Sequence, residues 1–131
     1  MDPASELDDI RSLLDAATPA VLMTYRTDGS AAVSPVWFRS TDEAFEVVVA
    51  KGDGKLRHLQ RDPRCVLLIF EAVAPFRGVR IEGDAELDGS NVDDARRAIS
   101  ERYLGPEAAD AFVAARGEGV IVRLPASAAR V

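Results

Sequence analysis

Six short apolar segments recur along the chain, most of them bounded by residues that favour turns. Apolar runs of this length with such boundaries are typical of β-strands. The predicted strands cover residues 20–25, 31–38, 44–50, 65–70, 78–87 and 119–124, and a further strand could begin after residue 126. Pro35 lies inside the second of them, and because proline cannot donate to a strand ladder, it predicts a bulge or a sheet edge there.

Helical spacing of apolar residues predicts four helices, over residues 6–16, 55–61, 92–103 and 106–116. Asp53 is positioned to cap the second helix, and Gly105-Pro106 separates the last two. Because most strands are joined by short turns and helices are inserted between them, we expect a mainly β fold, an antiparallel sheet or barrel with peripheral helices. The βαβαβ alternation and the GxGxxG turn of a dinucleotide-binding domain are both missing from the sequence.

Length and composition are those of a single soluble domain. The 131 residues are 47% hydrophobic and 29% charged, with a formal net charge of −6. We expect one domain over residues 1–131, and a chain this acidic is not suited to hold nucleic acid by bulk attraction. No apolar run reaches the roughly 18 residues of a membrane helix, and the polar N-terminus is unlike a signal peptide, so the predicted location is the cytoplasm.

Cys65 and His58 are the only residues of their kinds in the sequence. An internal disulfide, a cysteine metal cluster and a histidine metal site are therefore excluded, and we expect no metal. A cysteine that begins an apolar strand is most simply a small buried hydrophobe. A single histidine on the flank of a helix is more often a surface or interface residue than a catalytic one, so no catalytic side chain is assigned.

Basic residues are concentrated in residues 51–64, a segment that carries five of them against two acidic ones. Such an island in an acidic chain suggests one localised anionic ligand, although basic clusters are also common on solvated helix surfaces. Its first residues lead from a strand into a helix, whose free N–H groups and dipole favour an anion. We therefore expect Lys51 and Lys55 to bind a phosphate, with an outward orientation left open for the Lys51 side chain.

Four pieces of sequence occur in a set order: VLMTYRTDGS at 21–30, SPVWF at 34–38, VVVAKGDGKLRHLQRDPR at 47–64 and RGVRIEGDAEL at 77–87. Together they resemble the pyridoxamine-phosphate-oxidase-like split-barrel family, and within it the small flavin and deazaflavin oxidoreductases. The third piece is the most specific, and the resemblance covers about residues 7–125. It implies a six-stranded antiparallel split β-barrel of the FMN-binding type that forms a homodimer, with two cofactor sites between the subunits.

The cofactor that this resemblance implies is the deazaflavin F420 as first choice, or FMN. The cofactor-binding residues that it implies are Ser34, Pro35, Val36, Trp37, Val49, Ala50, Lys51, Lys55, Leu56, Phe76 and Arg77. The first four would form the wall beside the ring system, the next two its floor, and the last two would come from the partner subunit. Trp37 is also compatible with a core position, and Arg77 with a solvated strand face.

The implied function is an oxidoreductase in which the cofactor carries the chemistry and a hydride passes to a small conjugated organic substrate. His58 stands where relatives often have asparagine, and the paired arginines of a true pyridoxamine phosphate oxidase are absent, so oxidation of pyridoxamine phosphate is not expected. One alternative is a protein that binds or sequesters flavin, F420 or haem without turnover. Another is a structural dimer whose cleft has decayed.

Overall fold

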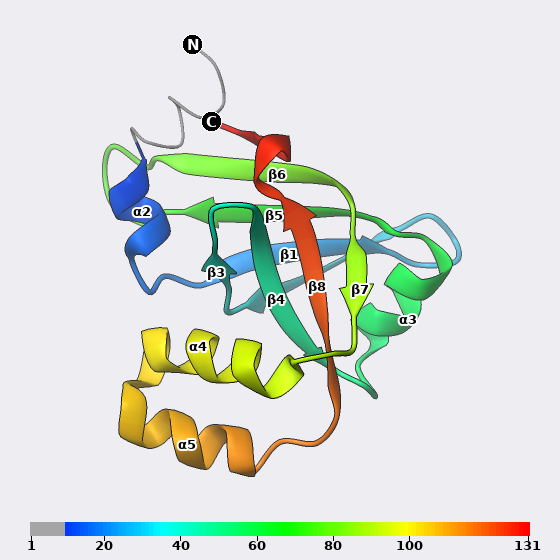
Figure 1. The fold of residues 1–131 in the computed structure, drawn as a ribbon. Coiled ribbons are helices and arrows are strands. Elements are labelled where there is room, and N and C mark those ends of the chain that lie inside the picture. The colour runs from blue at the N-terminus through cyan, green and yellow to red at the C-terminus, as the bar shows by residue number, and fades with distance from the viewer. Residues whose placement is uncertain (1–9) are drawn as a thin grey trace.

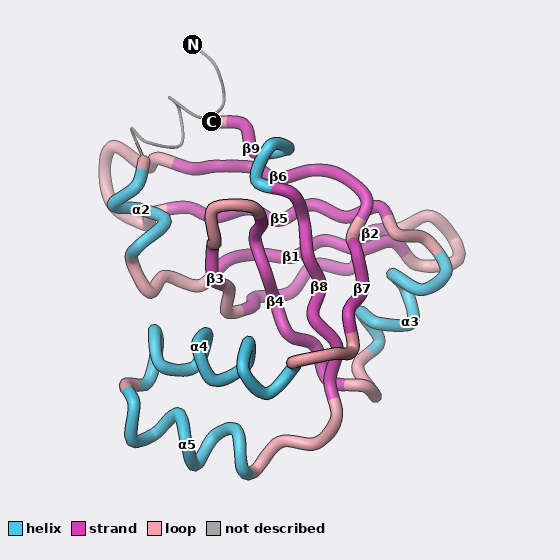
Figure 2. Tube along the Cα trace, in the orientation of Figure 1, coloured by secondary structure: helices cyan, strands magenta, loops and turns pink. Residues whose placement is uncertain are grey.

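The computed structural model describes residues 10–131, and the nine strands of that part form two antiparallel sheets (Figure 1). The first sheet has the strand order β2-β1-β5-β6-β9, and the second has the order β3-β4-β8-β7. Strands of the second sheet run steeply across those of the first (Figure 2), as in orthogonally packed sheets. The hydrophobic core lies between the two sheets.

The first sheet contains β1 (Ala20–Tyr25), β2 (Ala31–Val36), β5 (Arg64–Phe70), β6 (Gly78–Asp84) and β9 (Ala129–Arg130). Its central strands alternate between buried and more exposed positions, as expected for a sheet with one face on the core. β2 lies at the edge of the sheet, with Pro35 opposite Val21. The sheet edge predicted from Pro35 is therefore confirmed.

The second sheet contains β3 (Arg39–Ser40), β4 (Ala44–Ala50), β7 (Glu86–Asp88) and β8 (Gly119–Pro125). β4 and β8 pair along their whole length, from Ala44 opposite Pro125 to Ala50 opposite Gly119. Each of these seven-residue strands contains three β-branched residues, which pack well on a pleated surface. β4 carries one face of the site described below.

Four helices surround the sheets within the described residues: α2 (Arg11–Asp15), α3 (Gly54–Arg61), α4 (Val92–Leu104) and α5 (Pro106–Ala114). A short 3₁₀ turn, Ala126–Ala128, precedes β9. The Asp53 side chain accepts a hydrogen bond from the Lys55 backbone N–H, which confirms the predicted cap of α3. The part of the first predicted helix before residue 10 lies outside the described residues.

The predicted mainly β fold with antiparallel sheets and peripheral helices is confirmed. The six-stranded split barrel is wrong for the described residues, because their nine strands form two separate sheets that do not close into a barrel. The strand predicted over 78–87 divides at Ala85, whose N–H donates to the carbonyl of Pro63, the residue just before β5. The residues before Ala85 belong to the first sheet, and those after it to the second. The strand predicted over 31–38 ends at Val36, because the Phe38 N–H turns toward the Tyr103 hydroxyl.

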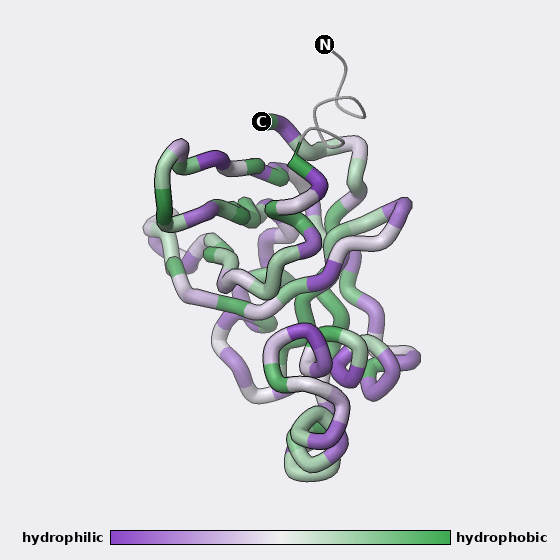
Figure 3. The backbone as a smooth tube through the Cα atoms, turned by 90° about the vertical axis from the view of Figure 1, so that its left-hand side faces the viewer, coloured by the Kyte–Doolittle hydropathy of each residue, from purple (hydrophilic) through white to green (hydrophobic). Residues whose placement is uncertain are grey.

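The core joins the inner faces of both sheets with α2 and α3. Its fully buried members include Leu22, Leu67 and Ile81 of the first sheet and Leu124 of the second. Figure 3 shows that apolar positions are concentrated in the strands, whereas hydrophilic ones gather at hairpin tips. α4 and α5 pack together below the second sheet in Figure 1, and α4 contacts β4 and β8.

Candidate functional site

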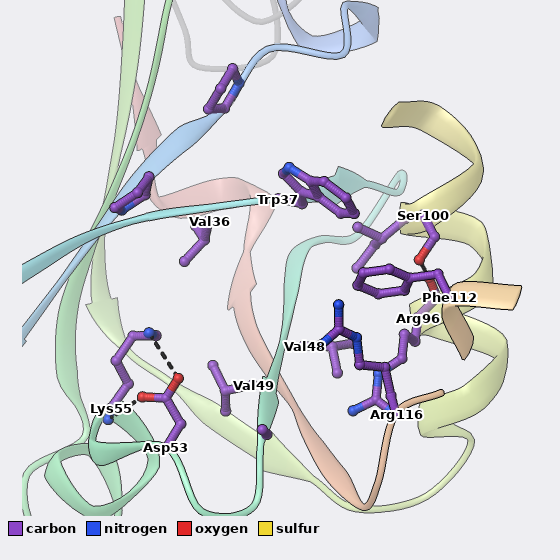
Figure 4. A pocket seen from close by; sticks show the side chains of 14 residues that line it. Val36, Trp37, Val48, Val49, Asp53, Lys55, Arg96, Ser100, Phe112 and Arg116 are labelled. Atoms are coloured by element: carbon purple, nitrogen blue, oxygen red, sulfur yellow. Dashed lines mark hydrogen bonds and ion pairs between the residues drawn. The ribbon is translucent and has the colours of Figure 1, made fainter. Parts of the chain in front are cut away.

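A pocket of about 680 Å³ opens between β2, β4, the start of α3 and the α4–α5 pair (Figure 4). Segments far apart in the sequence line it, because the ends of both sheets meet the helices there. The lining residues are Pro19, Pro35, Val36, Trp37, Val48, Val49, Ala50, Asp53, Lys55, Arg96, Ile99, Ser100, Phe112 and Arg116. Concave, mostly apolar pockets with a few polar groups are typical ligand sites.

One wall of the pocket is formed by Pro35, Val36 and Trp37, at the end of β2. The Trp37 ring stacks on Tyr103 with centroids 4.8 Å apart and an interplanar angle of 7°, and Phe112 lies against it at 5.3 Å. The Tyr103 hydroxyl donates to the carbonyl of Thr18 and accepts from the Phe38 N–H. Trp37 is thus held by aromatic packing and also lines the pocket.

The floor of the pocket comes from the last three residues of β4, Val48, Val49 and Ala50. Val49 is buried, whereas Ala50 is exposed at the end of the strand. Their small side chains leave room above the strand, so a flat ligand has space between this floor and the wall opposite.

Lys55 lies at one end of the pocket and is ion-paired with Asp53. Its Nζ is 2.9 Å from Asp53 Oδ2, while Asp53 Oδ1 accepts the Lys55 backbone N–H at 2.9 Å. Partial burial acts to raise the pKa of Asp53, but the hydrogen bonds from Lys55 outweigh it and hold that pKa below its ordinary value. The cation of Lys55 is therefore largely balanced by a carboxylate that stays ionised.

Arg96 and Arg116 line the pocket from the side of α4 and α5, and the sequence analysis did not select them. Arg96 is a buried residue, and its Nη1 donates to the carbonyl of Gly117 at 2.8 Å. The Arg116 guanidinium lies over the Phe112 ring, 4.0 Å from its centroid. A sequence signal did exist, since Arg96 is next to Ala95 and four residues before Ser100 on the buried side of α4. Helix periodicity alone, however, does not show that this side meets β4.

The structure brings six of the eleven expected residues to the pocket: Pro35, Val36, Trp37, Val49, Ala50 and Lys55. Ser34 lies on β2 opposite Leu22, and Leu56 is buried in the core. The Lys51 ammonium is directed away and is 2.8 Å from the Glu118 carboxylate, which raises the pKa of Lys51 through that hydrogen bond. These residues lie outside the pocket.

Phe76 and Arg77 lie in the loop before β6, also outside the pocket of their own chain. Phe76 is exposed and has a positive φ of 59°. Arg77 Nε is 2.9 Å from Glu71 Oε2, and its Nη1 donates to the Ser12 hydroxyl. Their expected role was in a partner subunit, and within the described chain they form a local loop structure.

His58 contacts another side chain and Cys65 is buried, and neither residue lines the pocket. His58 Nδ1 is 2.9 Å from the hydroxyl oxygen of Thr24, a fully buried residue, and this contact ties α3 to β1. Cys65 is 1% exposed at the start of β5, as predicted for a small buried hydrophobe, and burial raises the pKa of its thiol to about 12. A thiol held so firmly in its neutral form is a poor nucleophile.

Neither a metal-ion cluster nor a membrane-spanning helix is found among residues 10–131. In that range, no three side chains of His, Cys, Asp or Glu come together in a way that could hold a metal ion. Each helix there is too short or too polar to cross a membrane.

Solved structures with a similar fold span most of the chain. A conserved hypothetical protein from Mycobacterium tuberculosis has a TM-score of 0.79 and 25% identity over 94% of this chain and 81% of that one. A structure titled F420 reductase has a TM-score of 0.73 and 22% identity, over 92% and 94% of the two chains. A heme storage protein from Vibrio cholerae has a TM-score of 0.73 and 16% identity, over 100% and 95%.

No curated protein matches the sequence. A family model does, and it spans residues 7–129, nearly the whole chain. That model is the one described as pyridoxamine 5'-phosphate oxidase. Together with the two antiparallel sheets and the pocket between them and the helices, this match shows that the chain belongs to the pyridoxamine 5'-phosphate oxidase family.

Proposed function

We propose that this protein is an oxidoreductase that holds F420 or FMN in the pocket of about 680 Å³ and passes a hydride to a small conjugated organic molecule. The observation that carries the proposal is the pairing of a flat apolar wall and floor with cationic side chains at the ends of the same pocket. FMN or F420 needs this combination, because the ring system of each is flat and the side chain of each bears a phosphate.

The lining side chains fit such a group. Pro35, Val36 and Trp37 would contact one part of the ring system, and Val49 and Ala50 another. Lys55, at the start of α3, would contact the phosphate in competition with the Asp53 carboxylate that pairs with it. When bound, the cofactor supplies the hydride chemistry. The protein would orient the ring through Trp37, which Tyr103 and Phe112 hold in place.

F420 is the first choice of cofactor and FMN the second. The similar structure titled F420 reductase favours the first, whereas the family model favours a flavin more generally. The similar fold of a heme storage protein keeps binding without turnover as a second candidate. Cofactor affinity and electron transfer therefore need separate measurements.

The experiment that tests the proposal is a calorimetric titration of the purified protein with F420, FMN and riboflavin. We expect micromolar binding of F420, weaker binding of FMN, and still weaker binding of riboflavin, which has no phosphate to meet Lys55. Tighter binding of FMN would assign the protein to the flavin branch. If none of the three binds, the proposal is wrong.

Electron transfer is tested on the loaded protein. The reduced cofactor is mixed with conjugated enones and tetrapyrroles, and its reoxidation is followed by absorbance against the free cofactor at equal concentration. Reoxidation that is faster on the protein supports an oxidoreductase. Equal or slower reoxidation with every acceptor supports the binding or sequestering candidate instead.

We also propose that the protein is a homodimer and that the outer face of the first sheet is its interface. Large hydrophobic side chains are exposed on this face at Val33 (62%), Leu68 (40%) and Phe70 (37%). Val33 and Leu68 point to the same side, since each lies opposite an outward-facing residue of β1. Phe76, in the adjoining loop, is 68% exposed. A contiguous apolar face of this kind is typical of an interface between subunits.

Replacing Leu68 with aspartate is expected to convert the dimer to monomers, because it places a charge in the centre of the buried face. Light scattering should give twice the chain mass of 14.1 kDa for the native protein and that mass for the variant. The control is Leu104→Asp, since Leu104 is equally exposed at 41% but lies at the end of α4. A native protein of 14.1 kDa, or a variant that stays dimeric, contradicts the proposed interface.

A further inference from the structure

We propose that Arg96 and Arg116 form a second anion-binding subsite, at the end of the pocket opposite Lys55, for a carboxylate or phosphate of a bound small molecule. In Figure 4 the two arginines lie on the side of α4 and α5, whereas Lys55 and Asp53 lie on the side of α3, with Val49 between. This inference deepens the proposed function, because it assigns an acidic group to a ligand of the same pocket.

The first argument is the shortage of partners around a buried guanidinium. The Arg96 side chain is 8% exposed, and a guanidinium has five N–H donors. Among the described residues it donates one hydrogen bond, to the carbonyl of Gly117, and its nearest carboxylate is Asp93 at 3.8 Å. Asp93 is itself 83% exposed, so it is a weak partner in water. Because Arg96 also lines the pocket, this guanidinium has N–H donors left over for an anion or acceptor that enters there.

The second argument is the space beside Gly119 that the Arg96 side chain occupies. Gly119 lies on β8 opposite Ala50, and a Cβ atom at Gly119 would overlap Nη2 of Arg96. The same Cβ would lie 3.0 Å from the carbonyl oxygen of Val49. Glycine at this position therefore lets the guanidinium rest against the sheet, at the edge of the pocket floor, where it lines the pocket.

The third argument is the distribution of charge around the pocket. Lys55, Arg96 and Arg116 are its cationic lining residues, and Asp53 is the acidic one. Asp53 is already paired with Lys55 at 2.9 Å, so the Lys55 end is close to neutral. Arg116 stacks on Phe112 and has no carboxylate partner among the described residues. The excess positive charge of the pocket thus lies at the end formed by α4 and α5, and it attracts an anion from solution.

The two possible sources of the anion are the cofactor, through its own phosphate, and the acceptor molecule, through a carboxylate. Both would make the same bidentate contacts with a guanidinium. The first titration below tests whether the subsite exists. The later titrations identify which molecule occupies it and whether the cofactor binds at all.

The test is an NMR titration of the free protein with inorganic phosphate at constant ionic strength. The reporters are the Arg96 Nε–H resonance and the backbone amides of Gly117 and Gly119. We expect shifts that saturate with phosphate. Arg96→Gln should abolish the saturation at both glycine amides, and Arg116→Gln, a change at an exposed residue, should weaken the affinity roughly 10-fold.

The matched control is Arg57→Gln, which removes one positive charge from an exposed residue of α3 that does not line the pocket. It should leave the titration unchanged. Shifts that do not saturate, or that persist in both Arg96→Gln and Arg116→Gln, overturn the subsite. An equal loss with Arg57→Gln also overturns it, because the effect is then one of net charge.

Two further titrations identify the occupant, using protein saturated with FMN and protein saturated with riboflavin. If FMN prevents phosphate binding at Arg96 and riboflavin does not, the phosphate of the cofactor occupies the subsite, and the role proposed for Lys55 in contacting that phosphate is wrong. If both loaded forms still bind phosphate, the subsite serves the acidic group of the acceptor. A protein that binds phosphate but neither cofactor would contradict the proposed function and leave the subsite standing.

Discussion

Replacing Glu46 with glutamine is expected to lower the free energy of unfolding by about 3 kcal/mol at neutral pH. Glu46 is 4% exposed in β4, where Oε1 accepts from Arg39 Nε at 2.6 Å and Oε2 accepts from Arg123 Nε at 2.7 Å. The variant leaves two arginines beside a neutral amide. The expected loss is at the lower end of the range for a broken buried pair, because Arg39 and Arg123 keep 28% and 25% of their side chains exposed.

The contribution of Glu46 should also depend on pH. Burial acts to raise the pKa of Glu46, but the hydrogen bonds from Arg123 and Arg39 outweigh it and hold that pKa below its ordinary value. The folded protein therefore binds this proton less readily than the unfolded chain does, whose glutamates titrate near about pH 4.3. Its contribution is fully present above that pH and is lost as the pH falls through the lower pKa of the folded state.

Urea unfolding at pH 7 and at pH 3.5 measures both effects. The gap in stability between native protein and Glu46→Gln should be widest at pH 7 and narrower at pH 3.5. Glu82→Gln is the control, since Glu82 is 62% exposed and 3.6 Å from Arg80, and it should change stability by less than about 0.5 kcal/mol. Equal effects of the two substitutions would show that the Glu46 network adds nothing to stability.

Replacing Ala50 with tryptophan is expected to weaken cofactor binding by roughly 100-fold, about 2.8 kcal/mol. Ala50 lines the pocket at the end of β4 and is exposed, so an indole there fills space that the proposed ligand needs. The same exposure means that the core is not repacked. The free energy of unfolding should therefore stay within about 0.5 kcal/mol of the native value.

Calorimetric titration with the tighter-binding cofactor, together with urea unfolding, checks this expectation. Ala108→Trp is the matched control, because Ala108 is exposed on α5 and does not line the pocket. It should bind the cofactor with native affinity. An Ala50→Trp protein that is stable and binds as tightly as the native one would place the cofactor elsewhere.

Several elements could be predicted from the sequence because their determinants are local. The strands over 20–25 and 44–50 have the predicted bounds, since each is an apolar run closed by turn residues. The cap of α3 was predictable for the same reason, as Asp53 needs only the N–H group two residues later. The division of the strand at Ala85 was not, because it depends on tertiary pairing: the part before Ala85 pairs with β5 of the first sheet and the part after it with β8 of the second.

The same distinction applies to the pocket. The residues that line it from β2, β4 and α3 are contained in continuous motifs, so resemblance to the family could indicate them. Arg96 comes from α4, whose contact with β4 is purely tertiary, and Arg116 lies in the loop that follows α5. Lys51 shows the reverse case, because it follows the strand as the motif suggests, yet Glu118 across the strand pair holds its ammonium outside the pocket.

The placement of α4 and α5 in the chain has an evolutionary consequence. They are inserted between β7 and β8, which are hydrogen-bonded neighbours, so both ends of the insertion are fixed at one site on the sheet. Lengthening or exchanging such an insertion leaves the strand register unchanged. Doubling its length costs only about 0.6 kcal/mol in loop-closure entropy. The half of the pocket that carries Arg96 and Arg116 can therefore diversify among relatives while the half on β2, β4 and α3 stays constant.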